Sequence, residues 1–325
     1  MILVYGSAQR GDEAGAVSGG FGSLHPVRDR GNNSAMNERL QGPTRYVVLF
    51  IAIVLAGWIG AKAAGVAVAS NGALASSILQ SESPSSAALA ILGYLVVGTL
   101  MAGAVGRLTN AAVGLFVLGC GLYAVAFRSG TIEDLAFGGQ GLLPLVAIET
   151  LLWALALALA SAVVFLIAGP LQDMKPELGD TSRSIWSPTG LSSPALGTIV
   201  LVGVVLIARS HGKGQTIMAV LIGSMAAGMV ARALRPRIQP ILLFASPCLF
   251  GAVGHLIGWK MVSKPLDEAF VDRDLWSLSL AMPADYAAGS LLGVSLGLGW
   301  AKSFMHPESD SFGAELAGGA PKQSA

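Results

Sequence analysis

Glu149 is the first residue in this sequence whose type and position suggest chemistry, because it is an acid inside a long apolar segment. No other charged residue lies between Leu135 and Gln172. A carboxyl group in hydrocarbon is costly, and such residues usually face a bundle interior, a partner or a water-filled cavity. Two roles therefore stay open for Glu149: a proton- or cation-binding carboxylate on a transport pathway, or a hydrogen-bonded carboxyl that ties its helix to a neighbour.

Two further ionisable residues lie in or at the start of apolar segments. His255 is the only histidine well inside one, and it could relay protons with Glu149 or be a hydrogen-bonded structural group. A haem with two histidine ligands would need a second histidine at similar depth, whereas His211 lies in a predicted loop, so we expect no haem. Asp285 follows Pro283 by two residues, where an acid complements the helix dipole and caps free N–H groups.

The two cysteines, Cys120 and Cys248, lie in two different apolar segments. Thiolates are soft ligands and could hold Cu(I), whereas thiols also pack as small apolar groups. We favour packing for both cysteines, keep them as metal candidates only in this sense, and predict no metal and no cofactor.

Arg107 and Arg232 each end an apolar segment. Either guanidinium could bind an anion at the end of a transport pathway. Either could instead complement a helix C-terminus and anchor it at the membrane interface.

Familiar enzyme motifs are missing from the whole sequence. It contains no HExxH zinc pair, no GxSxG elbow, no GxxxxGK[ST] phosphate loop and no CxxC. The usual residues of an intramembrane hydrolase or an ATP-driven motor are therefore absent, and we do not expect an enzyme.

The composition indicates what must position these residues. Hydrophobic residues make up 53% of the 325 residues and charged residues only 12%, against about 25% charged in soluble domains. The net charge of +1 gives no electrostatic signature for nucleic acid. We predict an all-α integral membrane protein, with the lipid bilayer as its surroundings. Hydropathy places eight membrane helices near 46–66, 86–106, 110–128, 142–168, 194–209, 214–233, 238–259 and 284–303.

Two stretches of the sequence resemble each other and predict two parallel four-helix repeats. Gly98 to Arg107 matches Gly223 to Arg232 at five of ten positions, and a second match pairs Cys120 with Cys248. Four spans in each half would give a pseudo-twofold axis along the membrane normal. The resulting domains are a disordered segment 1–45, whose first 35 residues look like a gene-start artefact before Met36, a first repeat 46–168, a linker 169–193, a second repeat 194–303 and a disordered tail 304–325.

The distribution of basic residues orients the chain. The group Arg232, Arg235 and Arg237 favours a plasma-membrane protein with both termini in the cytoplasm. The last predicted helix carries Gly289, Gly293 and Gly297, whose i, i+4 spacing allows close helix packing, either within the chain or against a second copy or another membrane protein.

These observations lead to two expectations about function. The first is a small-solute or ion permease, with Glu149 as the coupling carboxylate, His255 as its possible partner, and Arg107 and Arg232 at the ends of the pathway. The alternative is a non-catalytic membrane scaffold or complex subunit that packs through its glycine-rich last helix.

Overall fold

Five helices in the described part of the chain are long and apolar enough to cross a membrane. The computed structural model describes residues 43–137, 142–171, 194–236 and 239–305, all within one unit, Leu40–Ala325. Within these ranges the chain forms helices and loops, and the one strand-like pairing is an isolated bridge between Val68 and Leu74. The predicted all-helical fold is confirmed for these residues, and their apolar helices indicate a membrane protein.

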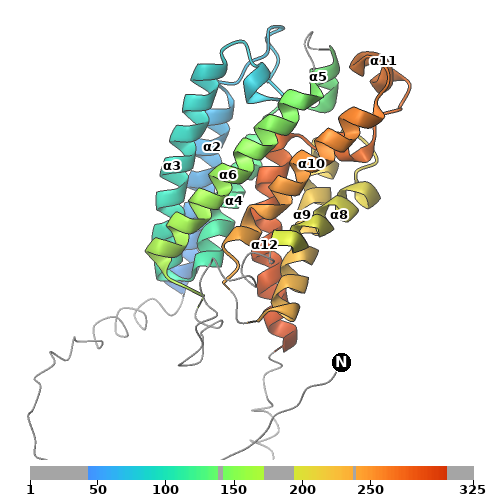
Figure 1. The fold of residues 1–325 in the computed structure, drawn as a ribbon. Coiled ribbons are helices and arrows are strands. Elements are labelled where there is room, and N and C mark those ends of the chain that lie inside the picture. The colour runs from blue at the N-terminus through green and yellow to red at the C-terminus, as the bar shows by residue number, and fades with distance from the viewer. Residues whose placement is uncertain (1–42, 138–141, 172–193, 237–238, 306–325) are drawn as a thin grey trace, which may run out of the picture. The chain divides into compact units, whose positions relative to one another are not determined.

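The longer helices follow one another along the chain in the order that hydropathy predicts. They are α2 (Pro43–Ala64), α3 (Pro84–Leu108), α4 (Ala111–Phe127), α6 (Leu143–Ala168), α8 (Ile199–Ile207), α9 (Lys213–Leu234), α10 (Ser246–Met261) and α12 (Pro283–Met305). Short elements connect them: η1 (Ile78–Gln80), α5 (Ile132–Phe137), η3 (Pro194–Thr198), η4 (Leu242–Phe244), α11 (Leu266–Val271) and η5 (Ser277–Ser279). Figure 1 shows the first residues of α2 and the last of α12 at the same end of the bundle.

A helix occupies each of the eight predicted apolar ranges, but the count of eight spans is not confirmed. α4 has 17 residues, which at 1.5 Å per residue is about 26 Å and short of the roughly 30 Å hydrocarbon core. The apolar helix Pro194–Ile207 is also too short. α12 has 23 residues but is rich in Gly and Ser, and it is not among the five helices long and apolar enough to span.

Several predicted regions lie largely outside the described residues. These are the N-terminal segment 1–45 as far as residue 42, the linker 169–193 from residue 172 onward, and the tail 304–325 from residue 306 onward.

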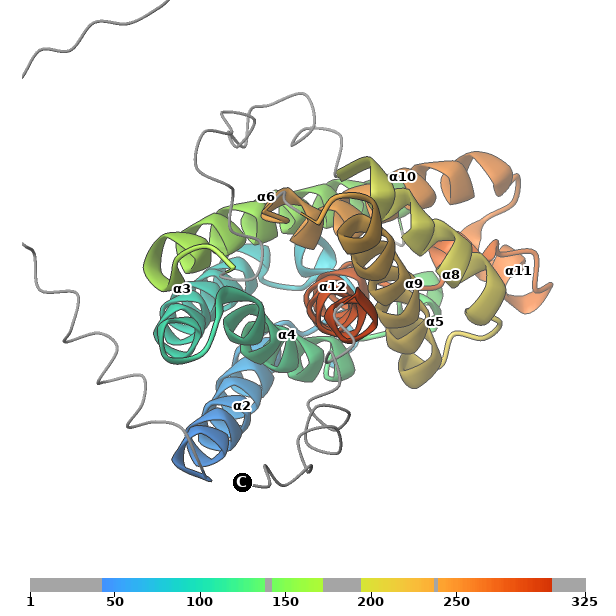
Figure 2. The ribbon, with the colours of Figure 1, turned by 90° about the horizontal axis from the view of Figure 1, so that it is seen from below.

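α12 lies between α4 and α9 in the view along the bundle (Figure 2) and also packs against α6 and α10. Its glycine row faces α9. A β-carbon added at Gly293 would lie 2.3 Å from the carbonyl oxygen of Leu221, and one at Gly297 would lie 2.1 Å from that of Met225. Only glycine permits so close an approach of two helix backbones. Within the described residues, the packing partner of this row is therefore α9 of the same chain.

α9 and α12 run parallel in one continuous register. Leu221 meets Gly293 and Met225 meets Gly297, a separation of 72 residues in both cases (293 − 221 and 297 − 225). The same separation recurs at the start of the two helices, where Lys213 meets Asp285. The register is therefore constant over more than three turns.

Large apolar side chains on α2, α3 and α6 point away from the core. Phe50, Leu89 and Leu166 are 68%, 70% and 83% exposed. Such a surface would be unfavourable in water but suits contact with lipid chains. α12 shows the opposite pattern, since nearly every residue from Ala284 to Leu298 is buried.

The close approach of α9 and α12 predicts that Gly293→Ala destabilises the protein. Its methyl group would meet the Leu221 backbone, and overpacking of this kind costs about 1–3 kcal/mol. The matched control is Gly93→Ala on α3, where an added β-carbon has nothing within 4 Å and helix propensity improves. Thermal unfolding in detergent measures both variants, and equal melting temperatures would contradict the inferred packing.

Candidate functional site

A cavity of about 400 Å³ opens at the end of the bundle where α2 begins and α12 ends. We call this the cavity end. Its wall comes from α2, the α3–α4 turn, α4, α9, α12 and Leu171, three residues after the end of α6. The lining residues are Leu49, Thr109, Asn110, Ala112, Val113, Phe116, Leu171, Arg232, Ser295, Leu296, Leu298, Gly299 and Lys302.

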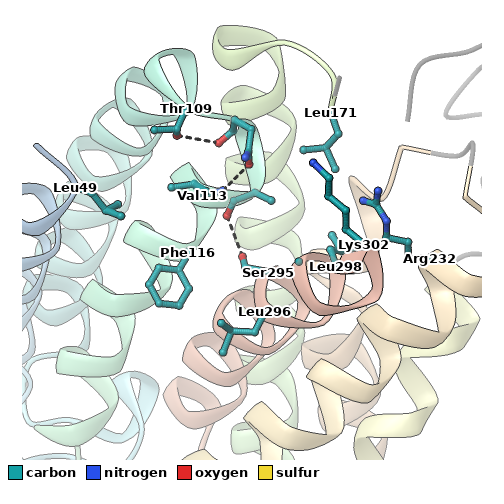
Figure 3. Close-up of a pocket in the computed structure, with 13 residues that line it drawn as sticks. Leu49, Thr109, Val113, Phe116, Leu171, Arg232, Ser295, Leu296, Leu298 and Lys302 are labelled. Atoms are coloured by element: carbon teal, nitrogen blue, oxygen red, sulfur yellow. Dashed lines mark hydrogen bonds between the residues drawn. The ribbon is translucent and has the colours of Figure 1, made fainter. Parts of the chain in front are cut away.

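Two basic side chains lie on one side of the cavity. Arg232 is in the last turn of α9 and only 3% exposed, and Lys302 is in the last turn of α12. Figure 3 shows both beside Leu171, with Phe116 and Leu296 farther from them. Leu171 is held by Gln239, which accepts a hydrogen bond from its N–H at 3.0 Å. The packing of α9 on α12 is what brings the two cations to the same wall.

The neutral polar residues of the wall bond to helix ends or join two helices. Asn110 caps α4 by accepting a hydrogen bond from the N–H of Val113 at 2.9 Å. Thr109 donates to the carbonyl of Val105 at 2.8 Å. Ser295 of α12 donates to the carbonyl of Ala112 on α4 at 3.1 Å (Figure 3). These bonds fix the wall formed by α4.

The charge of the lining determines what this cavity suits. Arg232 and Lys302 are cationic and each has a further interaction within the protein, and none of the described lining residues is acidic. In apolar surroundings the attraction between opposite charges is several times stronger than in water. Among the described residues no group of three or more His, Cys, Asp or Glu side chains could hold a metal ion. The described lining of the cavity is therefore positively charged.

Glu149 lies outside the cavity lining and joins α6 to the α2–α3 connection. Its carboxylate accepts hydrogen bonds from the Ser77 hydroxyl at 2.5 Å, the Leu79 N–H at 3.1 Å and the Trp153 indole N–H at 3.4 Å. The side chain is 4% exposed. This geometry matches the second of the two roles open for Glu149, a buried carboxyl that ties its helix to a neighbouring segment.

A buried ion pair links α9 to α12 at the end opposite the cavity. Lys213 Nζ lies 2.9 Å from Asp285 Oδ1, and the two side chains are 12% and 0% exposed. Asp285 also accepts hydrogen bonds from Thr216 Oγ1 and the Met282 N–H, both at 2.9 Å, and Lys213 donates to Ser129 at 3.0 Å. The bond from Met282, which precedes the first residue of α12, is the helix cap that the sequence predicts for Asp285.

Lys213 itself is a residue that sequence reasoning missed. A lysine in the first turn of a helix is opposed by the helix dipole, and this misplacement is a signal that an acid must lie nearby. The acid is 72 residues away in the sequence, so the pattern indicates that a partner is needed but not which one.

His255 is completely buried, and its ring meets Tyr286 edge-on with 5.5 Å between the ring centroids. Neither ring nitrogen has a hydrogen-bond partner in the described part of the chain. None of the donors to Glu149 comes from His255, so the structure does not join the two residues that the sequence suggested as a relay.

The remaining candidates separate in the structure. Arg107 ends α3 with an exposed side chain and does not line the cavity, whereas Arg232, its counterpart in the predicted repeat, does. Cys120 and Cys248 are free thiols. Cys248 donates to the Thr150 carbonyl at 3.3 Å and is buried in the core, which is how a packing thiol behaves.

On the surface near α11, Lys264 Nζ contacts Asp272 at 2.7 Å and Asp274 at 2.9 Å. The hydrogen bonds to Asp272 and Asp274 raise the pKa of the Lys264 ammonium group. Because these three groups are exposed to water, their ion pairs contribute little to stability. They serve as a reference for the buried pair of Lys213 and Asp285.

Comparison with known proteins gives no match: no protein-family model, no curated protein and no solved structure matches this chain.

The ion pair predicts a large effect of Asp285→Ala. Removing this carboxylate leaves the Lys213 ammonium buried without its counter-ion, which costs about 3–5 kcal/mol of unfolding free energy. The double variant Lys213→Met with Asp285→Leu should recover much of the loss. Asp272→Ala, which removes one of the two exposed contacts of Lys264, should change the melting temperature little. An equal effect of Asp272→Ala and Asp285→Ala would rule out the buried pair.

The hydrogen bonds of Glu149 predict that Glu149→Leu releases the α2–α3 connection. The variant leaves the Ser77 hydroxyl and the Leu79 N–H without an acceptor, at about 1–3 kcal/mol for each buried group. We expect faster proteolytic cleavage between Ala64 and Pro84 in detergent. Glu82→Leu, an exposed residue of the same connection, is the control. A cleavage rate equal to that of the control would assign Glu149 another role.

Proposed function

We propose that this protein is a permease-like membrane protein that binds a small anionic solute in the cavity between α4, α9 and α12. The observation that carries the proposal is the placement of Arg232 and Lys302 on one wall of the cavity, where each also has another interaction within the protein. The Arg232 side chain is buried, whereas Lys302 is exposed, so the attraction for an anion would be strongest beside Arg232, where water is excluded.

Contacts at the two ends of the bundle support transport rather than static binding. The cavity lies at one end, while at the other end the Lys213–Asp285 pair and the Glu149 hydrogen bonds hold the helices together. A carrier that exposes its site to one side at a time needs one such end open and the other held closed. In this proposal Glu149 secures the closed end, and coupling to a proton or cation would require it to release Ser77 and Leu79.

We also propose that eight helices cross the membrane as two four-helix repeats, 46–168 and 194–303. The helix packing supports this arrangement, because α4 packs on α12 and α6 packs on α10. In the two proposed halves α4 and α10 are the third helices, and α6 and α12 are the fourth. If the two halves change places, the contact of α4 with α12 becomes the contact of α10 with α6. The basic residues Arg232, Arg235 and Lys302 at the cavity end support a cytoplasmic location for that end.

The scaffold alternative gains less support. The glycine row of α12 is already in contact with α9, so a partner could use it only if α9 moved away. A solute site would give the cavity a role, whereas the scaffold alternative leaves the cavity unexplained.

The test compares the two charges of a small thiol reagent at the cavity. Val113→Cys is introduced after Cys120→Ala and Cys248→Ala, and is labelled with an anionic sulfonatoethyl or a cationic trimethylammonioethyl methanethiosulfonate. We expect the anionic reagent to react about tenfold faster or more and from one membrane face only. Leu115→Cys, on the same helix but completely buried, should not be labelled.

The charge preference must depend on Arg232. Arg232→Gln should lower the ratio of anionic to cationic labelling severalfold, whereas Arg107→Gln, outside the lining, should leave it unchanged. A ratio near one in the unsubstituted background would reject an anion site. Equal labelling of Val113→Cys from both faces would reject a cavity that opens to one side.

A further inference from the structure

Three buried polar side chains gather around one turn of α10, in the half of the helix that leads to α11. They are His255, Tyr286 of α12 and Ser279 of η5, and each is 0% exposed. Within the described residues, both ring nitrogens of His255 and the two hydroxyl groups have no hydrogen-bond partner. We call these three residues the α10 polar cluster. A buried polar group without a partner is unfavourable, so the cluster indicates a ligand that bonds to it.

Two glycines of α10 show how close together the members of the cluster lie. The rings of His255 and Tyr286 meet edge-on, with 5.5 Å between their centroids. A β-carbon added at Gly254, directly before His255, would lie 3.6 Å from the Tyr286 hydroxyl oxygen, and one added at Gly258 would collide with the Ser279 hydroxyl oxygen. Gly254 and Gly258 are about 6 Å apart along the helix axis. Polar groups from three elements therefore meet at a single helical turn.

The chemistry of the cluster favours a neutral ligand. Asp285, which precedes Tyr286, has its counter-ion in Lys213, 2.9 Å away, and Glu149 is held by donors of its own. The cluster itself contains only an imidazole and two hydroxyl groups. A neutral imidazole offers one donor and one acceptor, and each hydroxyl both donates and accepts. Such a set suits a molecule that also donates and accepts hydrogen bonds, rather than an ion.

The packing around the cluster limits the size of that ligand. A β-carbon added at Gly251 would lie 2.5 Å from a ring carbon of Tyr286, so α10 and α12 are in direct contact there. The packing is looser at Gly254, where an added β-carbon would have Leu201 Cδ2 at 3.2 Å, Leu278 Cβ at 3.5 Å and the Tyr286 hydroxyl oxygen at 3.6 Å. The space beside this hydroxyl is therefore on the scale of a methyl group or a single water molecule.

We propose that the α10 polar cluster is a binding site for water, in which a buried water molecule bonded to His255, Tyr286 and Ser279 joins α10 to η5 and α12. Buried waters in proteins make about three hydrogen bonds to groups that otherwise have none, and the cluster provides three such side chains. The site lies beside Asp285, at the end of the bundle opposite the cavity end (Figure 1). It goes beyond the proposed anion site and does not depend on it.

The test is oxidation of the intact protein in detergent by hydroxyl radicals that a short X-ray pulse generates from water, read by mass spectrometry. Radicals form from bound water in place, so a buried side chain that touches water is oxidised and a dry one is not. We expect Tyr286 to be oxidised severalfold faster than Tyr94, a buried tyrosine whose hydroxyl donates to the Leu118 carbonyl at 3.2 Å. Tyr46, which is exposed, gives the upper limit. Equal rates for Tyr286 and Tyr94 would overturn the proposal.

Filling the space beside the Tyr286 hydroxyl should displace the water. Gly254→Ala adds a methyl group there and should lower the oxidation rate of Tyr286 to that of Tyr94, whereas Gly93→Ala, where an added β-carbon has nothing within 4 Å, should leave it unchanged. If Gly254→Ala fails to fold, Ser279→Ala replaces it, since it removes one ligand of the water without adding volume. A Tyr286 rate that neither variant lowers would place the water elsewhere and overturn the site.

Thermal unfolding gives an independent reading of the same hydroxyl. If it bonds to water, Tyr286→Phe removes that bond and should lower the melting temperature, as Tyr94→Phe should by removing the bond to Leu118. If the hydroxyl has no partner of any kind, Tyr286→Phe removes an unfavourable group and should raise the melting temperature. A rise in the melting temperature of Tyr286→Phe therefore overturns the proposal, and a fall comparable to that of Tyr94→Phe supports it.

Discussion

The approach of α12 to α9 through its glycine row is the contact on which the other features depend. With larger residues at Gly289, Gly293 and Gly297 the two backbones could not meet at the observed separation. Because they do, two parallel helices share one register from end to end. The ion pair at their starts and the two cations at their last turns are both consequences of this register. The cavity also needs α4, whose contact with α12 includes the hydrogen bond from Ser295 to Ala112.

Charges inside the bundle are confined to places where partners can reach them. Glu149 receives three donors from a loop and from its own helix, and Asp285 receives a lysine, a threonine and a backbone N–H. In a membrane a polar group cannot turn to water instead, so each buried carboxylate must be surrounded by donors. Among the described residues the two ring nitrogens of His255 and several buried hydroxyl groups lack a hydrogen-bond partner.

The sequence predicted well what depends on local composition. Long apolar runs give helices, and Pro84, Pro144 and Pro283 fall in the first turns of α3, α6 and α12 as expected for proline. The cap at Asp285 follows from its distance to Pro283. Even the crowding of α12 could be anticipated from its three glycines, although not which helix they would contact.

What the sequence could not provide is the meeting of distant residues. Arg232 and Lys302 stand 70 positions apart (302 − 232), and nothing in hydropathy indicates that their helices end side by side. Glu149 stood out because it is alone in an apolar run, yet its partners Ser77 and Leu79 belong to a loop that resembles many others. A single acid in an apolar run therefore indicates that the residue is constrained, and only the fold shows by what.

The constant separation of 72 residues between α9 and α12 restricts how the molecule could move. If one helix slid along the other, Lys213 would separate from Asp285 within the core and each glycine would meet a side chain instead of a gap. Sliding is therefore opposed at both ends of the contact at once. A change of shape that keeps these contacts moves α9 and α12 together as one rigid piece.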